Sequence, residues 1–407
     1  MLIRNSKSIG FMFILVVLLI YPLPQIAIDI YLPSWPSLLN IFDVTRSSLQ
    51  LTLSIYILFL GMAQLFYGPC SDKFGRKPVL LFGCSLFVLA SIAIMFVTSI
   101  WQLMLLRAVQ GLGIGCGFAV ASAILADTFT GKKLAKMTTY SSMIYSLAVI
   151  FAPFFGSYLQ YYIGWRANFG AMALYGIILV MFIYIFVGET NERLDHEALL
   201  PKKITKNYLS LLSNICFSGN VVCISAAYGI MVAFSIISPF LLQTLLHVSV
   251  ISYGELISLV GLSYFAGTTA NSFLLKWLDV KILVILGFVC IFFASGCLAI
   301  VGAIGWFSPL SVTLFTCITI FGIGFVFPNC FSNALEVSPE KGVSGALIGS
   351  VVLIGSSITT FFVVHAQVNS EFGLSIVYLA LAVFSFASYM SSNFFTKISY
   401  NNKNNLR

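Results

Sequence analysis

Where two long apolar runs meet, at about 48–69 and 78–98, lies the polar stretch Gly68-Pro69-Cys70-Ser71-Asp72-Lys73-Phe74-Gly75-Arg76-Lys77. Each run has the length of roughly 20 apolar residues that a membrane-spanning helix needs. The stretch between them is therefore predicted to be a tight turn at the membrane surface, with a compact charge cluster of Asp72, Arg76 and Lys77. Gly68 would permit close helix approach, and Gly75 a sharp turn of the backbone.

The rest of the chain has the composition of a multi-pass membrane protein. Of its 407 residues 59% are hydrophobic and only 8% are charged, whereas soluble domains carry roughly 25% charged residues. We predict an all-α membrane protein with twelve spanning helices. They are placed at 9–33, 48–69, 78–98, 102–126, 137–160, 167–188, 213–243, 252–275, 282–304, 310–335, 344–367 and 374–395.

The longest polar interruption, from Glu189 to about Leu212, divides these helices into six and six. We expect an N-terminal six-helix bundle at 1–190 and a cytoplasmic linker at 191–212. A C-terminal six-helix bundle with a short cytoplasmic tail would occupy 213–407. No long polar segment remains for a separate soluble domain.

The basic residues indicate the orientation in the membrane. With both termini in the cytoplasm, 18 of the 21 Lys and Arg residues fall on the cytoplasmic side. Two, Arg46 and Arg166, fall outside, and Arg107 lies within a span. Cytoplasmic loops are typically rich in Lys and Arg, so the net charge of +8 reflects topology rather than binding to nucleic acid.

One carboxylate lies deep in the first apolar run, within Gln25-Ile26-Ala27-Ile28-Asp29-Ile30-Tyr31-Leu32-Pro33-Ser34-Trp35-Pro36. An acid at the centre of a span costs about 2.5–3.5 kcal/mol on insertion scales, so Asp29 is a candidate functional residue. Gln25 lies one helical turn earlier and on the same face. The prolines that follow predict a first helix that bends or ends toward the outer face.

The fourth span carries Arg107-Ala108-Val109-Gln110-Gly111-Leu112-Gly113-Ile114-Gly115-Cys116-Gly117. A buried arginine is as costly as a buried acid and should have a partner; we expect Asp29 to be its counter-charge. The glycines recur four apart, which lets helices pack closely. No strand precedes them, so a glycine-rich nucleotide loop is excluded.

In the fifth span, Pro153 and Gly156 predict a kink.

The stretch 68–77 resembles the signature of the major facilitator superfamily, and it matches at every position. The resemblance implies that Gly68, Asp72, Gly75, Arg76 and Lys77 form a conformational latch between the two six-helix bundles. In that latch Asp72 would face the beginning of the eleventh span. Arg76 would pair with an acid at the end of the fourth span, for which this sequence offers Asp127.

Two further motifs resemble those of the same superfamily. Arg107, Gln110, Gly111 and Gly113 match its helix-4 motif, whose arginine is linked to proton transfer in relatives. Pro153 and Gly156 match a shortened form of its antiporter signature, without the preceding glycines of the full form.

The stretch 25–36, which contains Asp29, resembles the corresponding part of drug/proton antiporters of the bicyclomycin-resistance type. It matches their Asp-x-Tyr-Leu-Pro-x-x-Pro pattern at Asp29, Tyr31, Leu32, Pro33 and Pro36.

From these patterns we expect a proton-coupled exporter of drugs or other amphipathic molecules in the bacterial inner membrane. Asp29 and Arg107 would couple transport to protons, and Asp29 and Gln25 would bind the substrate. Burial favours a neutral carboxyl and a nearby cation favours an ionised one, so Asp29 could alternate between the two forms. Expected partners are a small-molecule substrate, protons and the lipid bilayer. We expect no metal, cofactor or nucleic acid, and a monomer.

Alternatives remain open at this stage. The same fold could export one endogenous metabolite, such as a siderophore, amino acid or sugar, or take up a solute with protons. A membrane receptor or an intramembrane enzyme is a more remote alternative. The sequence has no HExxH motif, no nucleophile elbow and no Walker motif, which argues against an enzyme and against an ATP-driven pump.

Overall fold

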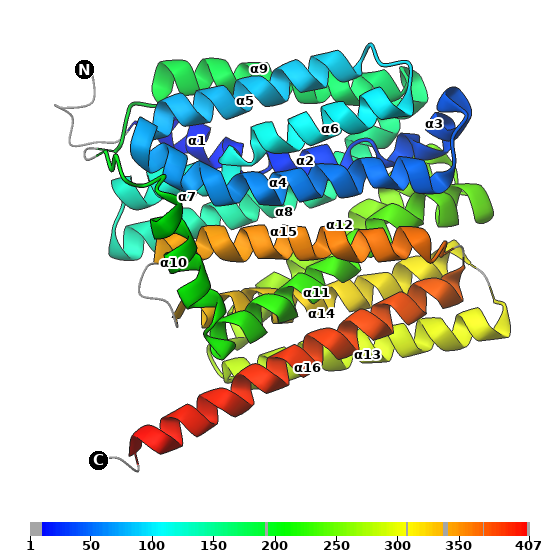
Figure 1. Cartoon of the computed structure of the whole chain (residues 1–407). Helices are drawn as coiled ribbons and strands as arrows, with labels where there is room; N and C mark the ends of the chain where they lie inside the picture. Colours follow the sequence, from blue (N-terminus) through cyan, green and yellow to red (C-terminus); the bar gives the residue numbers. More distant parts are fainter. Residues whose placement is uncertain (1–9, 192–193, 307, 337–340, 369, 405–407) are drawn as a thin grey trace. The chain divides into compact units, whose positions relative to one another are not determined.

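The computed structural model of the chain describes residues 10–191, 194–306, 308–336, 341–368 and 370–404. In this described part every regular element is a helix (Figure 1). Twelve helical segments among these residues are long and apolar enough to cross a membrane. Each of them coincides with a predicted span, so the predicted fold class is confirmed. The cytoplasmic placement of both termini stays a prediction.

The chain divides into two compact units, residues 1–204 and 205–407. In the first unit, the first span runs through α1 (Phe11–Ile20), α2 (Leu23–Asp29), η1 (Leu32–Ser34) and α3 (Trp35–Phe42). The second and third spans are α4 (Arg46–Phe74) and α5 (Arg76–Ile94), and the fourth is α6 (Ile100–Ile114) followed by α7 (Cys116–Thr128). The fifth and sixth spans are α8 (Gly131–Tyr162) and α9 (Trp165–Phe186).

The second unit has its own six spans. They are α11 (Ile215–Ser238) continued by the π-helical turn η2 (Pro239–Leu245), α12 (Val250–Leu274), α13 (Val280–Ile304), α14 (Pro309–Glu336), α15 (Lys341–His365) and α16 (Glu371–Asn404). Within this unit α11 packs on α14, α15 and α16, and α14 also packs on α12 and α13. Its core therefore lies around α11 and α14.

The first span is discontinuous because of its prolines. Pro22 and Pro24 stand at the beginning of α2, and Pro33 lies in η1 directly after it. Proline has no backbone N–H and so interrupts the hydrogen-bond ladder of a helix. The span is consequently built from short helices, and some carbonyl groups near their ends lack a helical donor.

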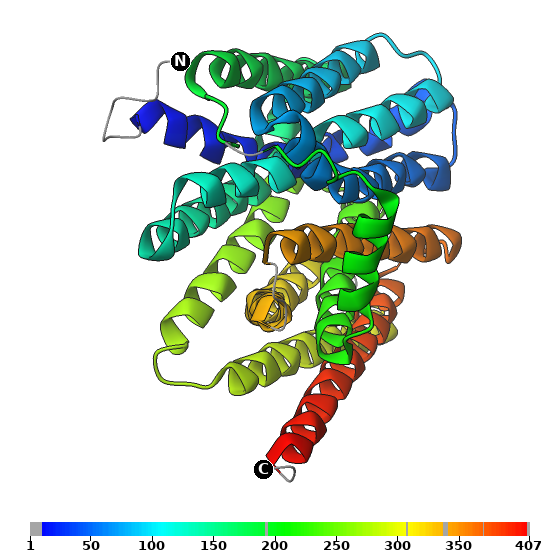
Figure 2. The same cartoon turned by 60° about the vertical axis from the view of Figure 1, so that its left-hand side comes forward.

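Close packing in the first unit depends on glycines of α6. This helix packs between α4 and α5, as the two views in Figures 1 and 2 show. A Cβ at Gly111 would overlap the backbone of Tyr56 on α4, and one at Gly113 would lie 2.6 Å from the backbone nitrogen of Phe87 on α5. The helix-4 motif therefore allows backbone-to-backbone contact on two sides.

A helix, α10 (Pro201–Leu212), forms in the stretch that we predicted as a linker. It begins at a proline, whose missing N–H is harmless at the first helical position. The division between the two units, between Ile204 and Thr205, falls inside this helix.

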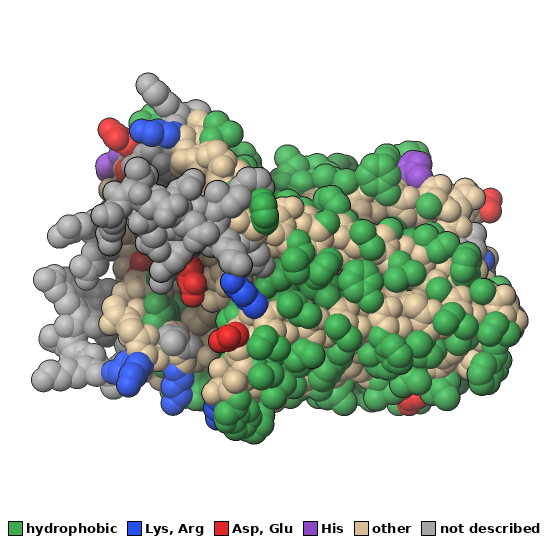
Figure 3. Space-filling view, turned by 90° about the horizontal axis from the view of Figure 1, so that it is seen from below, with side chains coloured by type: hydrophobic (Ala, Val, Ile, Leu, Met, Phe, Trp, Pro, Cys, Tyr) green, Lys and Arg blue, Asp and Glu red, His purple; other side chains and the backbone are tan. Residues whose placement is uncertain are grey.

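Hydrophobic side chains dominate the face of the molecule shown in Figure 3, and charged side chains lie mostly toward one end of it. Large exposed apolar residues include Phe96, Trp101, Leu105, Phe293 and Phe384. Such a surface is suited to contact with lipid rather than water.

Candidate functional site

Asp29 is the last residue of α2 and is buried, with 4% of its surface exposed. Its Oδ2 accepts a hydrogen bond of 2.7 Å from Nε2 of Gln25, one turn earlier in the same short helix. The amide oxygen of Gln25 accepts in turn from the hydroxyl of Tyr145 on α8, also at 2.7 Å. The structure thus brings together Asp29 and Gln25 as predicted, and adds a tyrosine that no motif indicated.

Side chains from three other helices bind the backbone of the broken first span. The Tyr175 hydroxyl donates to the carbonyl of Leu19 at 2.7 Å. The Tyr56 hydroxyl donates to the carbonyl of Pro24 at 2.9 Å. Arg107 Nη2 donates to the carbonyl of Ala27 at 3.0 Å. These donors satisfy carbonyl groups at and near the helix ends, and so fix the short segment that carries Asp29.

Arg107 does not form the ion pair with Asp29 that we expected. Its side chain is fully buried, and its Nη1 donates to Oε1 of Gln110 at 2.5 Å. The guanidinium lies over the rings of Tyr31 and Tyr56, 4.5 and 4.1 Å from their centroids. Aromatic faces and a carbonyl dipole stabilise a cation without a carboxylate, so the charge is compensated without Asp29.

Gln110 extends the Arg107 contacts toward α5. Its Nε2 donates to the hydroxyl of Ser91 at 2.7 Å, and that hydroxyl donates to the carbonyl of Phe87 at 2.7 Å. The Nε atom of Arg107 is buried and has no hydrogen-bond partner among the described residues. The helix-4 motif is therefore a polar core that joins the first, third and fourth spans.

Gly156 of the proline motif lies against the residue that follows Asp29. A Cβ at this position would overlap the carbonyl group of Ile30. Pro153 stands three residues earlier inside α8, which packs on α2. The motif thus brings the fifth span to the backbone of the first, next to the buried carboxyl.

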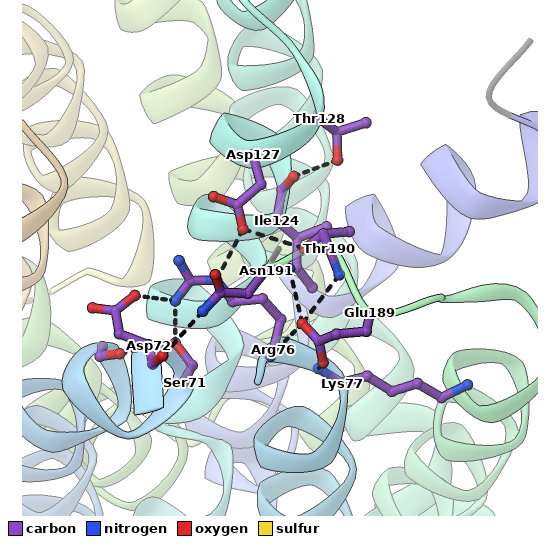
Figure 4. Close-up of polar contacts among 11 residues, drawn as sticks. Ser71, Asp72, Arg76, Lys77, Ile124, Asp127, Thr128, Glu189, Thr190 and Asn191 are labelled. Carbon is purple, nitrogen blue, oxygen red and sulfur yellow. Dashed lines mark hydrogen bonds and ion pairs between the residues drawn. The ribbon is translucent and has the colours of Figure 1, made fainter. Parts of the chain in front are cut away.

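A second polar cluster joins the beginning of α5 to the ends of α4 and α7 (Figure 4). Arg76 Nη1 bonds Asp72 Oδ1 at 2.5 Å and the Ser71 hydroxyl at 2.7 Å. Its Nε bonds Asp127 Oδ2 at 2.9 Å. The contact between Arg76 and Asp127 that the resemblance implied is therefore present. The expected contact of Asp72 with the beginning of the eleventh span involves the other unit and stays a prediction.

Glu189 completes this cluster, and we did not predict its role. Its carboxylate accepts from the backbone N–H groups of Arg76 at 2.9 Å and Lys77 at 3.1 Å (Figure 4). A carboxylate at the first N–H groups of a helix binds orphan donors and complements the helix dipole. Gly75 has φ of +97°, and a Cβ there would lie 2.5 Å from Glu189 Oε2.

Two other residues of the predicted latch behave differently. The Lys77 ammonium points to the carbonyl of Tyr184 at 2.8 Å, away from the acids. Among the described residues of its own unit, a Cβ at Gly68 would meet no atom within 4 Å, and close approach to a helix of the other unit stays a prediction. The carbonyl of Gly68 accepts from the Ser71 hydroxyl at 2.9 Å, which supports the last turn of α4.

The described residues contain no group of three or more His, Cys, Asp or Glu side chains that could hold a metal ion. The described residues form twelve spans, with a buried acid on the broken first span and a charge cluster at the ends of three others. This combination defines the class of multi-pass membrane transporters.

Comparisons with known proteins identify the family. The Major Facilitator Superfamily profile matches residues 17–360. A bicyclomycin resistance protein homolog of Haemophilus influenzae is 25% identical over 391 residues, which cover 95% of this chain and 97% of that protein. The multidrug resistance protein MdtL of Escherichia coli K12 is 27% identical over 341 residues, 84% of each chain.

Solved structures show the same fold. A crystal structure of a D-xylose-proton symporter superposes with a TM-score of 0.74 at 15% identity, covering 95% of this chain and 97% of the other. A bacterial homolog of the human lysosomal transporter Spinster gives 0.72 at 15% identity, covering 97% and 99%. The chain belongs to the major facilitator superfamily, whose members are transporters and not enzymes.

Proposed function

We propose that this protein is a proton-coupled exporter of drugs or other amphipathic small molecules, working by alternating access in the bacterial inner membrane. The observation that carries the proposal is the buried carboxyl of Asp29 on the discontinuous first span. It forms no ion pair with a basic side chain among the described residues. An unpaired acid inside a membrane protein is costly and typically marks an ion or proton pathway.

In this mechanism Asp29 takes up a proton from one side of the membrane and releases it to the other. The neutral carboxyl suits the closed, desolvated site, and the ionised carboxyl attracts a cationic or polar substrate group. Proton and substrate would compete for one side chain, which is the minimum requirement for antiport. Gln25, bonded to Asp29, would contact the same substrate. Arg107 would supply fixed positive charge beside the first span while holding its backbone.

The cluster around Arg76 would serve as the conformational latch. It comprises Asp72, Arg76 and Asp127, with Gly75 and Glu189 shaping the turn. The distribution of Lys and Arg supports a cytoplasmic position for this cluster, since loops on that side typically carry the basic residues.

Two relatives named for multidrug or bicyclomycin resistance, similar over at least 84% of this chain, favour drug export. The proline motif at Pro153 and Gly156 supports the same direction. Export of one endogenous metabolite is the second candidate, because one fold hosts many substrates. A screen in a drug-sensitive bacterium that lacks its own pumps would separate the two. Broad resistance to dyes and antibiotics supports the drug exporter, and transport of one secreted metabolite supports the alternative.

Asp29→Asn is the direct test of the coupling. In proteoliposomes with an imposed pH gradient, we expect the wild type to accumulate ethidium and Asp29→Asn to lose gradient-driven accumulation. Asp43→Asn is the matched control: Asp43 follows α3 in the left-handed region, with φ of 48°, which asparagine tolerates. Full gradient-driven transport by Asp29→Asn would exclude Asp29 as the proton site.

A further inference from the structure

Tyr145 on the fifth span is connected to the buried acid through two hydrogen bonds in series. Its hydroxyl binds the amide oxygen of Gln25 at 2.7 Å, and the Gln25 amide nitrogen binds Asp29 at 2.7 Å. Gln25 and Asp29 are buried and belong to α2, whereas Tyr145 belongs to α8. The charge state of Asp29 is therefore linked to a neighbouring helix.

The direction of these bonds follows from the chemistry of the groups. An ionised carboxylate only accepts hydrogen bonds, so Gln25 must turn its N–H₂ group toward Asp29. Its amide oxygen then faces Tyr145, whose hydroxyl must donate. A protonated carboxyl can donate instead, so the amide can turn round and give its N–H to the phenol oxygen. The ionised state therefore has one consistent arrangement of these hydrogen bonds, and the protonated state has two, because its carbonyl oxygen still accepts.

The position of Tyr145 makes the hydrogen bonds from Tyr145 through Gln25 to Asp29 sensitive to a bend in α8. Tyr145 and Gly156 lie on opposite sides of Pro153 in that helix. Gly156 touches the backbone of Ile30, next to Asp29, while Tyr145 touches Gln25. A proline inside a helix removes one hydrogen bond and is the usual site of a bend. Bending at Pro153 would move the hydroxyl of Tyr145 relative to Gln25 while Gly156 stays against Ile30.

We propose that Tyr145 is a positioning residue for proton exchange at Asp29, acting by orienting the amide of Gln25. The proposal rests on the proposed proton-coupled function. The elements packed on α2 are α6, α8 and α9. Their charged or titratable groups that reach the first span are Arg107, Tyr145 and Tyr175, and α4 adds Tyr56. Tyr145 bonds the side chain of Gln25, whereas Arg107, Tyr175 and Tyr56 bond backbone carbonyl groups of the span.

The test measures protonation of Asp29 directly and needs no substrate. Infrared spectra of the reconstituted full-length protein are recorded against pH, and the band of the protonated carboxyl is identified by its loss in Asp29→Asn. Tyr145→Phe should destabilise the ionised form of Asp29 more than the neutral form. The Tyr145 hydroxyl donates to Gln25 and thereby strengthens the charge-assisted bond from Gln25 to the carboxylate. Protonation therefore begins at a higher pH, with the midpoint raised by about half a pH unit, or roughly threefold in proton affinity.

Two further variants separate this role from a general loss of structure. Tyr158→Phe removes a hydroxyl from the same helix beyond Pro153 and should leave the midpoint at the wild-type value. Gln25→Met breaks the chain at its centre, so adding Tyr145→Phe to it should cause no additional shift. An additional shift in that background would show that Tyr145 acts by another route and would overturn the proposal.

The outcomes also separate this proposal from the proposed function. If the wild-type protein shows no titrating band that depends on Asp29, the proton site itself is wrong. If the band titrates in the wild type and Tyr145→Phe has the same midpoint, only the role of Tyr145 is rejected. Size-exclusion profiles and thermal melting curves of the same preparations check that the variants are folded.

Discussion

Arg107 is a cation held entirely within the protein, yet its partners are neutral. Burying a charge costs several kcal/mol unless it is compensated. Here the compensation is divided among the Gln110 amide, the carbonyl of Ala27 and two tyrosine rings. This arrangement depends on the planar, forked shape of the guanidinium. Its two terminal nitrogens bond Gln110 and the carbonyl of Ala27, while its faces stack on the two tyrosine rings.

The substitution Arg107→Lys tests whether shape or charge matters at this position. Lysine keeps the charge but cannot make the two divergent bonds and the ring contacts together. We expect a loss of about 1–3 kcal/mol in folding stability and at least a tenfold fall in transport rate, measured by thermal melting and ethidium uptake into proteoliposomes. If the Arg107→Lys protein transported ethidium at the wild-type rate, Arg107 would act as a charge alone.

Arg166→Lys is the matched control for that experiment. Arg166 also binds a backbone carbonyl, that of Met95 at 2.8 Å, and also lies over a ring, that of Trp165. It differs in being exposed, and surface substitutions usually change stability by no more than about 0.5 kcal/mol. The contrast between the two variants isolates the effect of burial.

At the scale of elements, the contact between α8 and the first span depends on the absence of a side chain at Gly156. A Cβ would overlap the carbonyl group of Ile30, so Gly156→Ala must push α8 away from the segment that holds Asp29. Overpacking of this kind costs about 1–3 kcal/mol. We expect a lower melting temperature and a loss of most gradient-driven transport.

Gly296→Ala provides the comparison, because a Cβ in that part of α13 would meet no atom within 4 Å. Replacing a helical glycine in open space typically stabilises by about 0.4–1 kcal/mol. Equal effects of the two substitutions would mean that the approach of α8 to Ile30 has no special role.

The elements themselves could be predicted from the sequence, and their contacts only in part. Long apolar runs and the prolines of the first span are strong signals, because membrane thickness fixes helix length and proline cannot continue the hydrogen-bond ladder. The link between Arg76 and Asp127 was available from a motif. Tyr56, Tyr145 and Tyr175 were not, since nothing distinguishes them from the other tyrosines before the helices pack.

The expected ion pair between Arg107 and Asp29 was wrong, and the reason lies in the packing around the guanidinium. We paired Arg107 with Asp29 because they were the deep charges of the first unit, but aromatic rings, an amide and a backbone carbonyl surround the guanidinium instead. The residue type was informative, and the identity of its neighbours was decided by tertiary packing.

At the scale of the whole molecule, alternating access requires the ends of several helices to move together. The cluster around Arg76 links the end of the second span, the beginning of the third and the end of the fourth. The segment after the sixth span joins it through Glu189, and Asn191 Nδ2 donates to the carbonyl of Asp72 at 3.0 Å. Arg76 is buried, but the side chains of Asp72 and Asp127 reach solvent. Single ion pairs at the surface contribute only about 0–1 kcal/mol, so we expect the latch to act as a network.

A double-mutant cycle on Arg76→Gln and Asp127→Asn tests this network. We expect each single variant to reduce the initial rate of ethidium transport about tenfold. The double variant should be little slower than either, because both changes remove the same link and their coupling is about 1 kcal/mol. Lys73→Gln, which removes a positive charge from the same turn without contact to Asp127, should stay within about twofold of wild type. If the effects of Arg76→Gln and Asp127→Asn simply multiplied, the two residues would act independently. The cluster would then hold the turn in place without latching the moving ends together.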